Sequence, residues 1–221
     1  IYSNEMVQVT DKGQCINCHH YRNYGTDNMQ FHARQYMGGT IMSVDGQLRK
    51  INLKTDSTIS AGVYPAWHPT HDYIAYSTNK THQSIHSIDP NRVEVADEES
   101  DLILYDIRNN SVSVIENDSA EFECFPAWSP DGRMLYYVSA HYIAPFDSKR
   151  KEQIFLDCRE IRYDLYCKPF DPDTRTWGKP VLLFEPSESE RSATLPRVSP
   201  DGKLLMFSMA PYGVFHIWHR E

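Results

Sequence analysis

The sequence predicts an all-β protein made of β-propeller blades, each blade being a sheet of four antiparallel strands. A repeated segment carries this prediction, because self-similarity at a roughly fixed spacing is typical of repeat architectures. Each copy contains a proline, then a turn, then a run of alternating apolar residues. The copies span residues 63–77, 124–139 and 194–208, with Pro65, Pro126 and Pro196 at the equivalent position.

Each copy has the composition of a β-hairpin. The turn is Ser-Pro-Asp-Gly at 129–132 and 199–202, where proline presets φ, aspartate bonds its own backbone and glycine accepts a positive φ. The residues after these turns alternate as in a half-buried strand. The first copy has His68-Pro-Thr-His71 instead, so we expect a different turn geometry there.

Further hairpins complete the blades. Residues 101–115 and 161–184 each read as two strands joined by a polar turn, and Asp45-Gly46 between two apolar runs signals one more hairpin. Long insertions at 80–100 and 141–160 separate the hairpins. We therefore expect an irregular or helical N-terminal segment at 1–39 and blades over 40–221: a half-blade at 40–60, blades at about 62–116 and 123–185, and a partial blade at 193–221.

Two tryptophans occupy equivalent places in the repeat. Trp67 and Trp128 each follow the anchoring proline by two residues, and Val198 is the smaller counterpart in the third copy. We expect these side chains to pack between neighbouring blades. Two complete blades with partial blades on either side do not close a ring, since propellers have four to eight. The remaining blades are expected in absent sequence or in another chain.

Residues 15–19 read Cys-Ile-Asn-Cys-His, the spacing that attaches c-type haem. Two thiols three positions apart can each add to a vinyl group of one porphyrin, and the histidine after them then lies under the iron. On this hypothesis Cys15 and Cys18 hold the thioethers and His19 is the proximal ligand. A zinc site and no cofactor stay open as alternatives, although zinc needs further ligands and there is no second C-x-x-C.

The second axial ligand is predicted to be His32, with Met29 and Met37 as alternatives. A methionine would raise the reduction potential relative to a second histidine, so the choice affects function. Arg34 could pair with a haem propionate through a charge-assisted hydrogen bond or could be an ordinary surface arginine. His20 directly follows the motif and is poorly placed to reach the opposite face of the iron.

Composition excludes some classes of function. The 221 residues carry a net charge of −8 and no basic stripe, which argues against nucleic acid as a partner. No apolar run approaches the length of a bilayer span. Covalent haem attachment takes place outside the bacterial cytoplasm, so the motif favours a periplasmic or otherwise extracytoplasmic protein. In that setting Cys158 and Cys167 could form a disulfide or remain two buried thiols.

The repeat resembles a known family. Pro126-Ala-Trp-Ser-Pro-Asp-Gly132 and the strand after it look like the blade motif of the TolB-type (WD40-like) β-propeller repeat proteins. The C-x-x-C-H, the following Met-x-x-His-x-Arg and the Gly-Gly before a hairpin resemble exported bacterial propellers that carry a haem motif ahead of their blades. This second resemblance also favours His32 as the distal ligand.

Three functions follow as hypotheses. The first is an exported haem-c propeller that transfers electrons or docks a redox partner. The second is a TolB-like, non-enzymatic protein-interaction module of the bacterial envelope. The third is a propeller enzyme acting on glycans or peptides. The chain lacks the G-x-S-x-G motif, so the sequence does not indicate an attached serine peptidase.

Overall fold

A computed structural model of the chain describes residues 2–3, 14–34, 38–85, 93–147, 149–157 and 160–211. Apart from one helix, α2 (Arg150–Asp157), and the 3₁₀ turns η1 (Arg22–Tyr24) and η3 (Pro186–Ser189), the regular structure in these ranges is extended. The strands are β1 (Tyr2–Ser3), β2 (Gln14–Tyr21), β3 (Met29–Arg34), β4 (Gly39–Val44), β5 (Gln47–Ile51), β6 (Gly62–Trp67), β7 (Tyr73–Ile85), β8 (Val93–Asp106), β9 (Ser111–Glu116), β10 (Glu121–Trp128), β11 (Met134–His141), β12 (Asp164–Asp171), β13 (Thr176–Trp177), β14 (Val181–Phe184), β15 (Ser192–Val198) and β16 (Leu205–Ala210).

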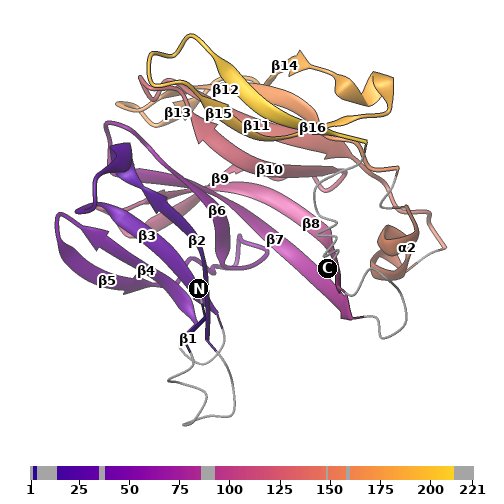
Figure 1. The fold of residues 1–221 in the computed structure, drawn as a ribbon, viewed down its shortest axis with the longest axis horizontal. Coiled ribbons are helices and arrows are strands. Elements are labelled where there is room, and N and C mark those ends of the chain that lie inside the picture. The colour runs from indigo at the N-terminus through magenta and orange to yellow at the C-terminus, as the bar shows by residue number, and fades with distance from the viewer. Residues whose placement is uncertain are drawn as a thin grey trace.

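The strands form successive antiparallel units, as the predicted fold class requires (Figure 1). The first unit is β2-β3-β4-β5, with the short β1 added at its edge. The second is β6-β7-β8-β9, and the third is β10-β11-β12-β14, with β13 also paired to β12. One parallel pair, Phe122↔Ser100, joins β10 to β8, so these two units share a nine-stranded sheet. A fourth unit begins with the β15–β16 hairpin. The chain is therefore an all-β protein of propeller blades.

The N-terminal segment differs from the expectation. We expected 1–39 to be irregular or helical and 40–60 to be a half-blade. Instead, β2 and β3 pair with β4 and β5, so the motif and the Asp45-Gly46 hairpin belong to one sheet. The physical reason is the free edge of β4: β3 satisfies its backbone groups through a regular antiparallel register from Met29↔Ser43 to Ala33↔Gly39.

Tryptophans fill the junctions between units, as the repeat predicts. Trp67 is 4% exposed and packs in a cluster with Met42 and Leu53 of the first unit and Tyr76 of its own. Trp128 is 8% exposed and packs in the corresponding cluster between the second and third units. Burial of these large side chains is the main force that holds neighbouring blades together.

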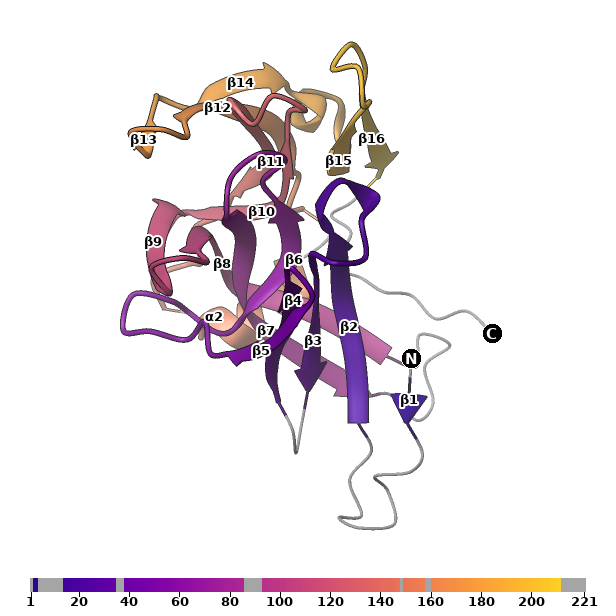
Figure 2. The ribbon, with the colours of Figure 1, turned by 90° about the vertical axis from the view of Figure 1, so that its left-hand side faces the viewer.

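The innermost strand of each unit contacts that of the next. These strands are β2, β6, β10 and β15, and the blades fan outward from them (Figure 2). The insertion expected at 80–100 extends β7 and β8 into a long hairpin, and the insertion at 141–160 contains α2. The apolar residues 215–219, which suggested a further strand, lie outside the described residues. Over the described ranges, no helix is both long and apolar enough to cross a membrane.

Candidate functional site: the bulges of the innermost strands

Each innermost strand contains a β-bulge at the same place. The strand registers shift between Asn17 and His20, and at the equivalent points of β6, β10 and β15. The first residue of each bulge has a positive φ: Cys18 (52°), Tyr64 (48°), Phe125 (56°) and Leu195 (51°). Such a backbone is unfavourable for a residue other than glycine, so its recurrence shows a feature built into the blade.

The bulge aligns the C-x-x-C-H motif with the repeat. Cys18 is equivalent to the residue before the anchoring proline, and His19 takes the place of that proline. His20 then corresponds to Ala66, Ala127 and Arg197 in the other units, and Tyr21 corresponds to Trp67, Trp128 and Val198. The motif therefore lies on the innermost strand of a blade, in a fourth copy of the repeat.

The bulge places His19 on the surface. Its side chain is exposed, and its ring lies edge-on to Tyr21 with the centroids 6.1 Å apart. Cys18 is half-buried, and its carbonyl accepts a hydrogen bond of 2.6 Å from Gln30 Nε2. The backbone of Cys15 pairs with Arg34 across β2 and β3, but both side chains lie outside the described part of the structure.

His32 lies in different surroundings from His19. It is 9% exposed, and its Nδ1 shares a hydrogen bond of 3.3 Å with the Thr40 hydroxyl. Its neighbour on the same face of β3 is Gln30, which is 1% exposed and accepts a hydrogen bond from Tyr76 of the second unit. The buried face of the first unit thus holds His32, and the structure does not bring it to the exposed side where His19 lies.

The other predicted ligands and cysteines are scattered. Met29 is half-buried on β3, and Met37 falls outside the described residues. Cys167 is a buried thiol without a disulfide, and Cys158 also falls outside the described residues. Cys124 is buried as well, and burial raises the pKa of its thiol to about 12. Within the described ranges, no group of three or more His, Cys, Asp and Glu side chains could hold a metal ion.

The bulge residues lie at equivalent points of innermost strands that contact one another. We call Cys18, Tyr64, Phe125 and Leu195 the inner surface. The rings of Tyr64 and Phe125 lie 4.6 Å apart, which joins the second and third units there. Tyr64 and Leu195 are 36% and 37% exposed, unusually high for apolar side chains on central strands. The inner surface therefore offers apolar groups to solvent.

Two basic side chains lie beside the inner surface. His20 and Arg197 occupy the position that holds alanine in the second and third units. Burial, the charge of Arg197 and the neighbouring His19 lower the pKa of His20 to about 4, so His20 is neutral at pH 7. Burial also lowers the pKa of Arg197. The charge of Arg197 contributes to the lowered pKa of His20, so both side chains act in the same region.

The sequence analysis considered His20 only as an unfavourable axial ligand and did not identify Arg197. The repeat could have indicated both residues, because each replaces an alanine at a fixed distance from the anchoring position. That comparison needs the first unit to be recognised as a copy. Its Cys-His-His-Tyr sequence conceals the equivalence to Phe-Pro-Ala-Trp, which only the shared bulge reveals.

Comparison with known proteins supports the fold. No family model matches the chain, and no curated protein matches it. A solved structure assigned as TolB from Agrobacterium tumefaciens superposes with a TM-score of 0.51 and 15% sequence identity, covering 90% of this chain. TolB from Acinetobacter baumannii gives a TM-score of 0.49 with 12% identity, over 90% of this chain and 39% of its own. Prolyl oligopeptidase B from Galerina marginata gives 0.47 with 9% identity, over 92% and 27%.

The first of these superpositions establishes the architecture and its extent. It includes 56% of the Agrobacterium protein, so the chain described here spans just over half the length of that structure. The four-stranded antiparallel units of this chain are those expected of propeller blades. This chain therefore has the TolB-type β-propeller fold.

Proposed function

We propose that this chain is a protein-interaction module that binds its partner at the inner surface. The observation that carries the proposal is the recurrent bulge, which places Cys18, Tyr64, Phe125 and Leu195 at the equivalent point of four successive innermost strands that contact one another. The blades share a backbone, but these side chains differ from one another. Residues that recur with the repeat serve the blade, whereas residues that vary on a shared scaffold are free to recognise a ligand.

The chemistry of the inner surface suits a protein partner. Tyr64 and Leu195 expose apolar area, and Tyr24, close enough to Arg197 to act on its pKa, is 88% exposed. Aromatic side chains of this kind are enriched where proteins bind one another. We further propose an extracytoplasmic location, with an envelope protein as partner. The C-x-x-C-H motif and the fold shared with a TolB-type structure support this location.

Site-specific photocrosslinking tests the interaction. A photoreactive phenylalanine analogue replaces Tyr64 or Leu195 in the full chain, and the same analogue replaces Leu48 as a control. Leu48 is 79% exposed on β5, the outer strand of the first unit. We expect one discrete protein adduct from the two inner positions and none from Leu48. Identical adduct patterns at all three positions, or none anywhere, would overturn the proposal.

A second candidate function is electron transfer by covalently attached haem c at Cys15 and Cys18. The observation in its favour is that His19 replaces a proline on the bulge and is exposed, while Cys18 beside it is half-buried. His19 would be the proximal ligand, and bound haem would supply one-electron chemistry. His32 does not fit as the distal ligand in this conformation, because it is buried and bonded to Thr40.

A haemochrome assay tests this candidate. The chain is expressed with haem-maturation machinery and then denatured, since thioether bonds survive unfolding. Covalent haem predicts colour that remains with the denatured chain, weakened by Cys15→Ala or Cys18→Ala. Loss of colour on denaturation would exclude covalent attachment. If His32 is the distal ligand, His32→Ala gives high-spin haem, and an unchanged low-spin spectrum would move that role to Met29 or Met37.

A further inference from the structure

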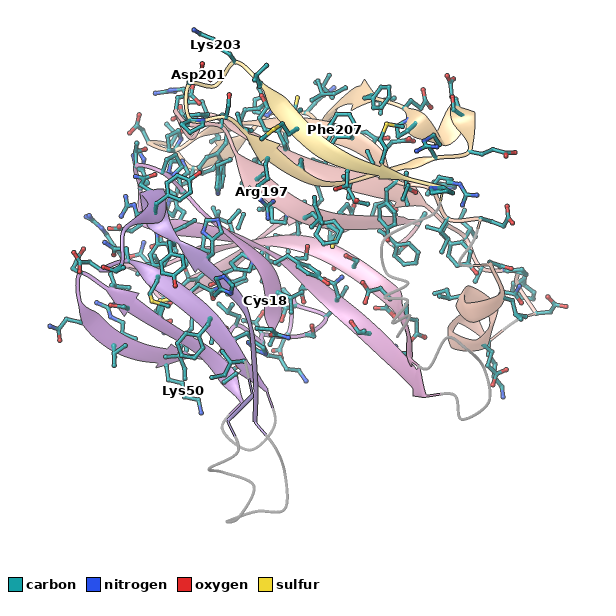
Figure 3. All side chains as sticks on the ribbon, viewed as in Figure 1. Cys18, Lys50, Arg197, Asp201, Lys203 and Phe207 are labelled. Carbon is teal, nitrogen blue, oxygen red and sulfur yellow. The ribbon has the colours of Figure 1, made fainter. Side chains whose placement is uncertain are left out.

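His20 and Arg197 are the two departures from alanine at one position of the repeat. The second and third units have Ala66 and Ala127 there, and both alanines are buried. The first and fourth units have a basic residue instead. Figure 3 shows Arg197 projecting from β15 toward the side of the molecule that holds β2 and Cys18. Two units at opposite ends of the described chain thus direct basic groups into one region.

His20 presents a hydrogen-bond donor to this region. Its Nδ1 accepts a hydrogen bond of 3.4 Å from the backbone N–H of Trp67. Because a ring nitrogen that accepts a hydrogen bond carries no proton, the His20 ring has its proton on Nε2. No hydrogen bond occupies that Nε2–H within the described ranges, so it remains a donor directed away from the second unit.

Arg197 adds a positive charge that no carboxylate neutralises. Its guanidinium donates to the Pro196 carbonyl at 2.7 Å, and it forms no ion pair with any described acidic residue. Several described arginines do form ion pairs: Arg22 and Arg108 both reach Asp72, Arg175 reaches Asp106, and Arg133 reaches Asp173. A guanidinium with free donors on an exposed apolar surface is a common recognition group for a carboxylate.

We propose that Arg197 and His20 together bind a carboxylate presented by an acidic segment of a protein partner. The inference rests on the proposed interaction at the inner surface and assigns the charge of the ligand. Arg197 supplies the charge-assisted hydrogen bonds, and the His20 Nε2–H supplies one more donor. Leu195 and Tyr24, which flank the pair and are exposed, contact the apolar part of the segment.

A titration followed by NMR tests the site. The probe is the peptide acetyl-Glu-Glu-Glu-amide, with acetyl-Gln-Gln-Gln-amide as the neutral control and acetate as the free carboxylate. The readout is the imidazole signal of His20, assigned by its loss in His20→Ala. We expect a saturable shift with the glutamate peptide and none with the glutamine peptide. Acetate should bind about tenfold more weakly, because it lacks the flanking contacts.

Variants of Arg197 make the test specific. Arg197→Gln is expected to lower the affinity for the glutamate peptide by at least about tenfold. Arg197→Lys should lower this affinity less, since a lysine keeps the positive charge but cannot donate two parallel hydrogen bonds to one carboxylate. Arg191→Gln, at an exposed position just before β15, is the matched control and should leave affinity unchanged. Unchanged thermal unfolding of each variant shows that the fold is intact.

The outcomes separate this inference from the function on which it rests. Equal affinity for glutamate and glutamine peptides, or for wild type and Arg197→Gln, would overturn the carboxylate site. Equal affinity for acetate and the glutamate peptide would overturn the assignment to a peptide. If the crosslinks at Tyr64 and Leu195 persist at full yield in Arg197→Gln, the interaction module stands and the carboxylate site fails. Absence of those crosslinks in wild type would remove the module itself.

Discussion

The indole N–H of Trp128 donates a hydrogen bond to the carbonyl of Ala66, 3.0 Å away across the junction between the third and second units. Trp67 occupies the same place at the previous junction, but its buried Nε1 has no acceptor among the described residues. At the position of Ala66, the first unit has His20, whose ring meets the Trp67 backbone N–H.

Replacing each tryptophan by phenylalanine should therefore have unequal effects. Both substitutions remove similar apolar area, but Trp128→Phe also breaks a buried hydrogen bond, whereas Trp67→Phe removes a donor that has no partner. We expect Trp128→Phe to lower the free energy of unfolding by about 1–2 kcal/mol more than Trp67→Phe. Urea denaturation of the two variants measures this difference. Equal losses would show that Trp67 has an acceptor in solution.

The sequence predicted most of the fold because the repeat is written in residues with strict backbone roles. Pro130 and Gly132 fix a turn that few other residues could make, so the second and third units were recognisable. The first unit was not recognisable as a copy of the repeat. Its bulge has no sequence signature, because an ordinary residue can adopt the positive φ at a cost of only about 1–2 kcal/mol. Cys18 and His19 therefore read as a separate motif.

The candidate site was less predictable than the fold. The C-x-x-C-H motif is local in sequence and was found at once. The pairing of His20 with Arg197 depends on the packing of innermost strands from opposite ends of the described chain, which no local pattern encodes. For the same reason His32 could be named as a ligand from spacing alone, whereas its burial and its hydrogen bond to Thr40 follow from the pairing of β3 with β4.

Gly132→Ala should be strongly destabilising, and Gly202→Ala only mildly so. Both glycines end a Ser-Pro-Asp-Gly turn with nearly the same φ, +70° and +72°. A Cβ at Gly132 would overlap the imidazole of His68, which is fully buried and bonded through Nε2 to the Gly132 carbonyl at 3.0 Å. A Cβ at Gly202 would have its nearest neighbour, Pro130 Cδ, at 3.7 Å.

Thermal or urea unfolding measures the two costs. The positive φ alone accounts for about 1 kcal/mol in Gly202→Ala, and the overlap should raise the loss in Gly132→Ala to roughly 3 kcal/mol or more. The experiment isolates the contact with His68 from backbone strain, because only one of the two turns has a histidine against it. Losses of the same size would contradict the close packing of His68.

Glu123 should make the protein less stable as pH rises. It is 3% exposed, its Oε2 has no hydrogen-bond partner among the described residues, and burial raises its pKa to about 8, with Asp101 and Glu116 adding to the effect. An unfolded glutamate ionises near pH 4.5. Between these values the native state holds a proton that the unfolded state has lost, so the free energy of unfolding falls with rising pH.

Glu123→Gln should remove this dependence above pH 6. Between pH 6 and pH 8 the free energy of unfolding of the wild type should fall by roughly 2 kcal/mol, and that of the variant should fall much less. Asp101, whose pKa burial raises to about 6, contributes mainly below that window. Glu188→Gln, at an exposed position, is the control and should keep the wild-type slope. A wild-type slope in Glu123→Gln would place the titration elsewhere.

Lys168 should contribute more to stability than any surface lysine, because it joins two blades inside the protein. It is 8% exposed, and its Nζ donates to Glu116 Oε1 at 2.6 Å and to the Ile115 carbonyl at 2.7 Å. Lys168 lies on β12 of the third unit, and both acceptors lie on β9 of the second. Lys168→Met would leave the Glu116 carboxylate without its partner at the junction. We expect a loss of about 3 kcal/mol in the free energy of unfolding.

Lys149→Met is the matched control, since Lys149 is exposed and reaches Glu152 at 3.5 Å, and it should cost less than about 0.5 kcal/mol. The double variant Lys168→Met/Glu116→Leu should recover much of the loss, because it removes both charges and leaves apolar groups at the junction. A double variant as unstable as the sum of its single changes would show that the two side chains are not coupled.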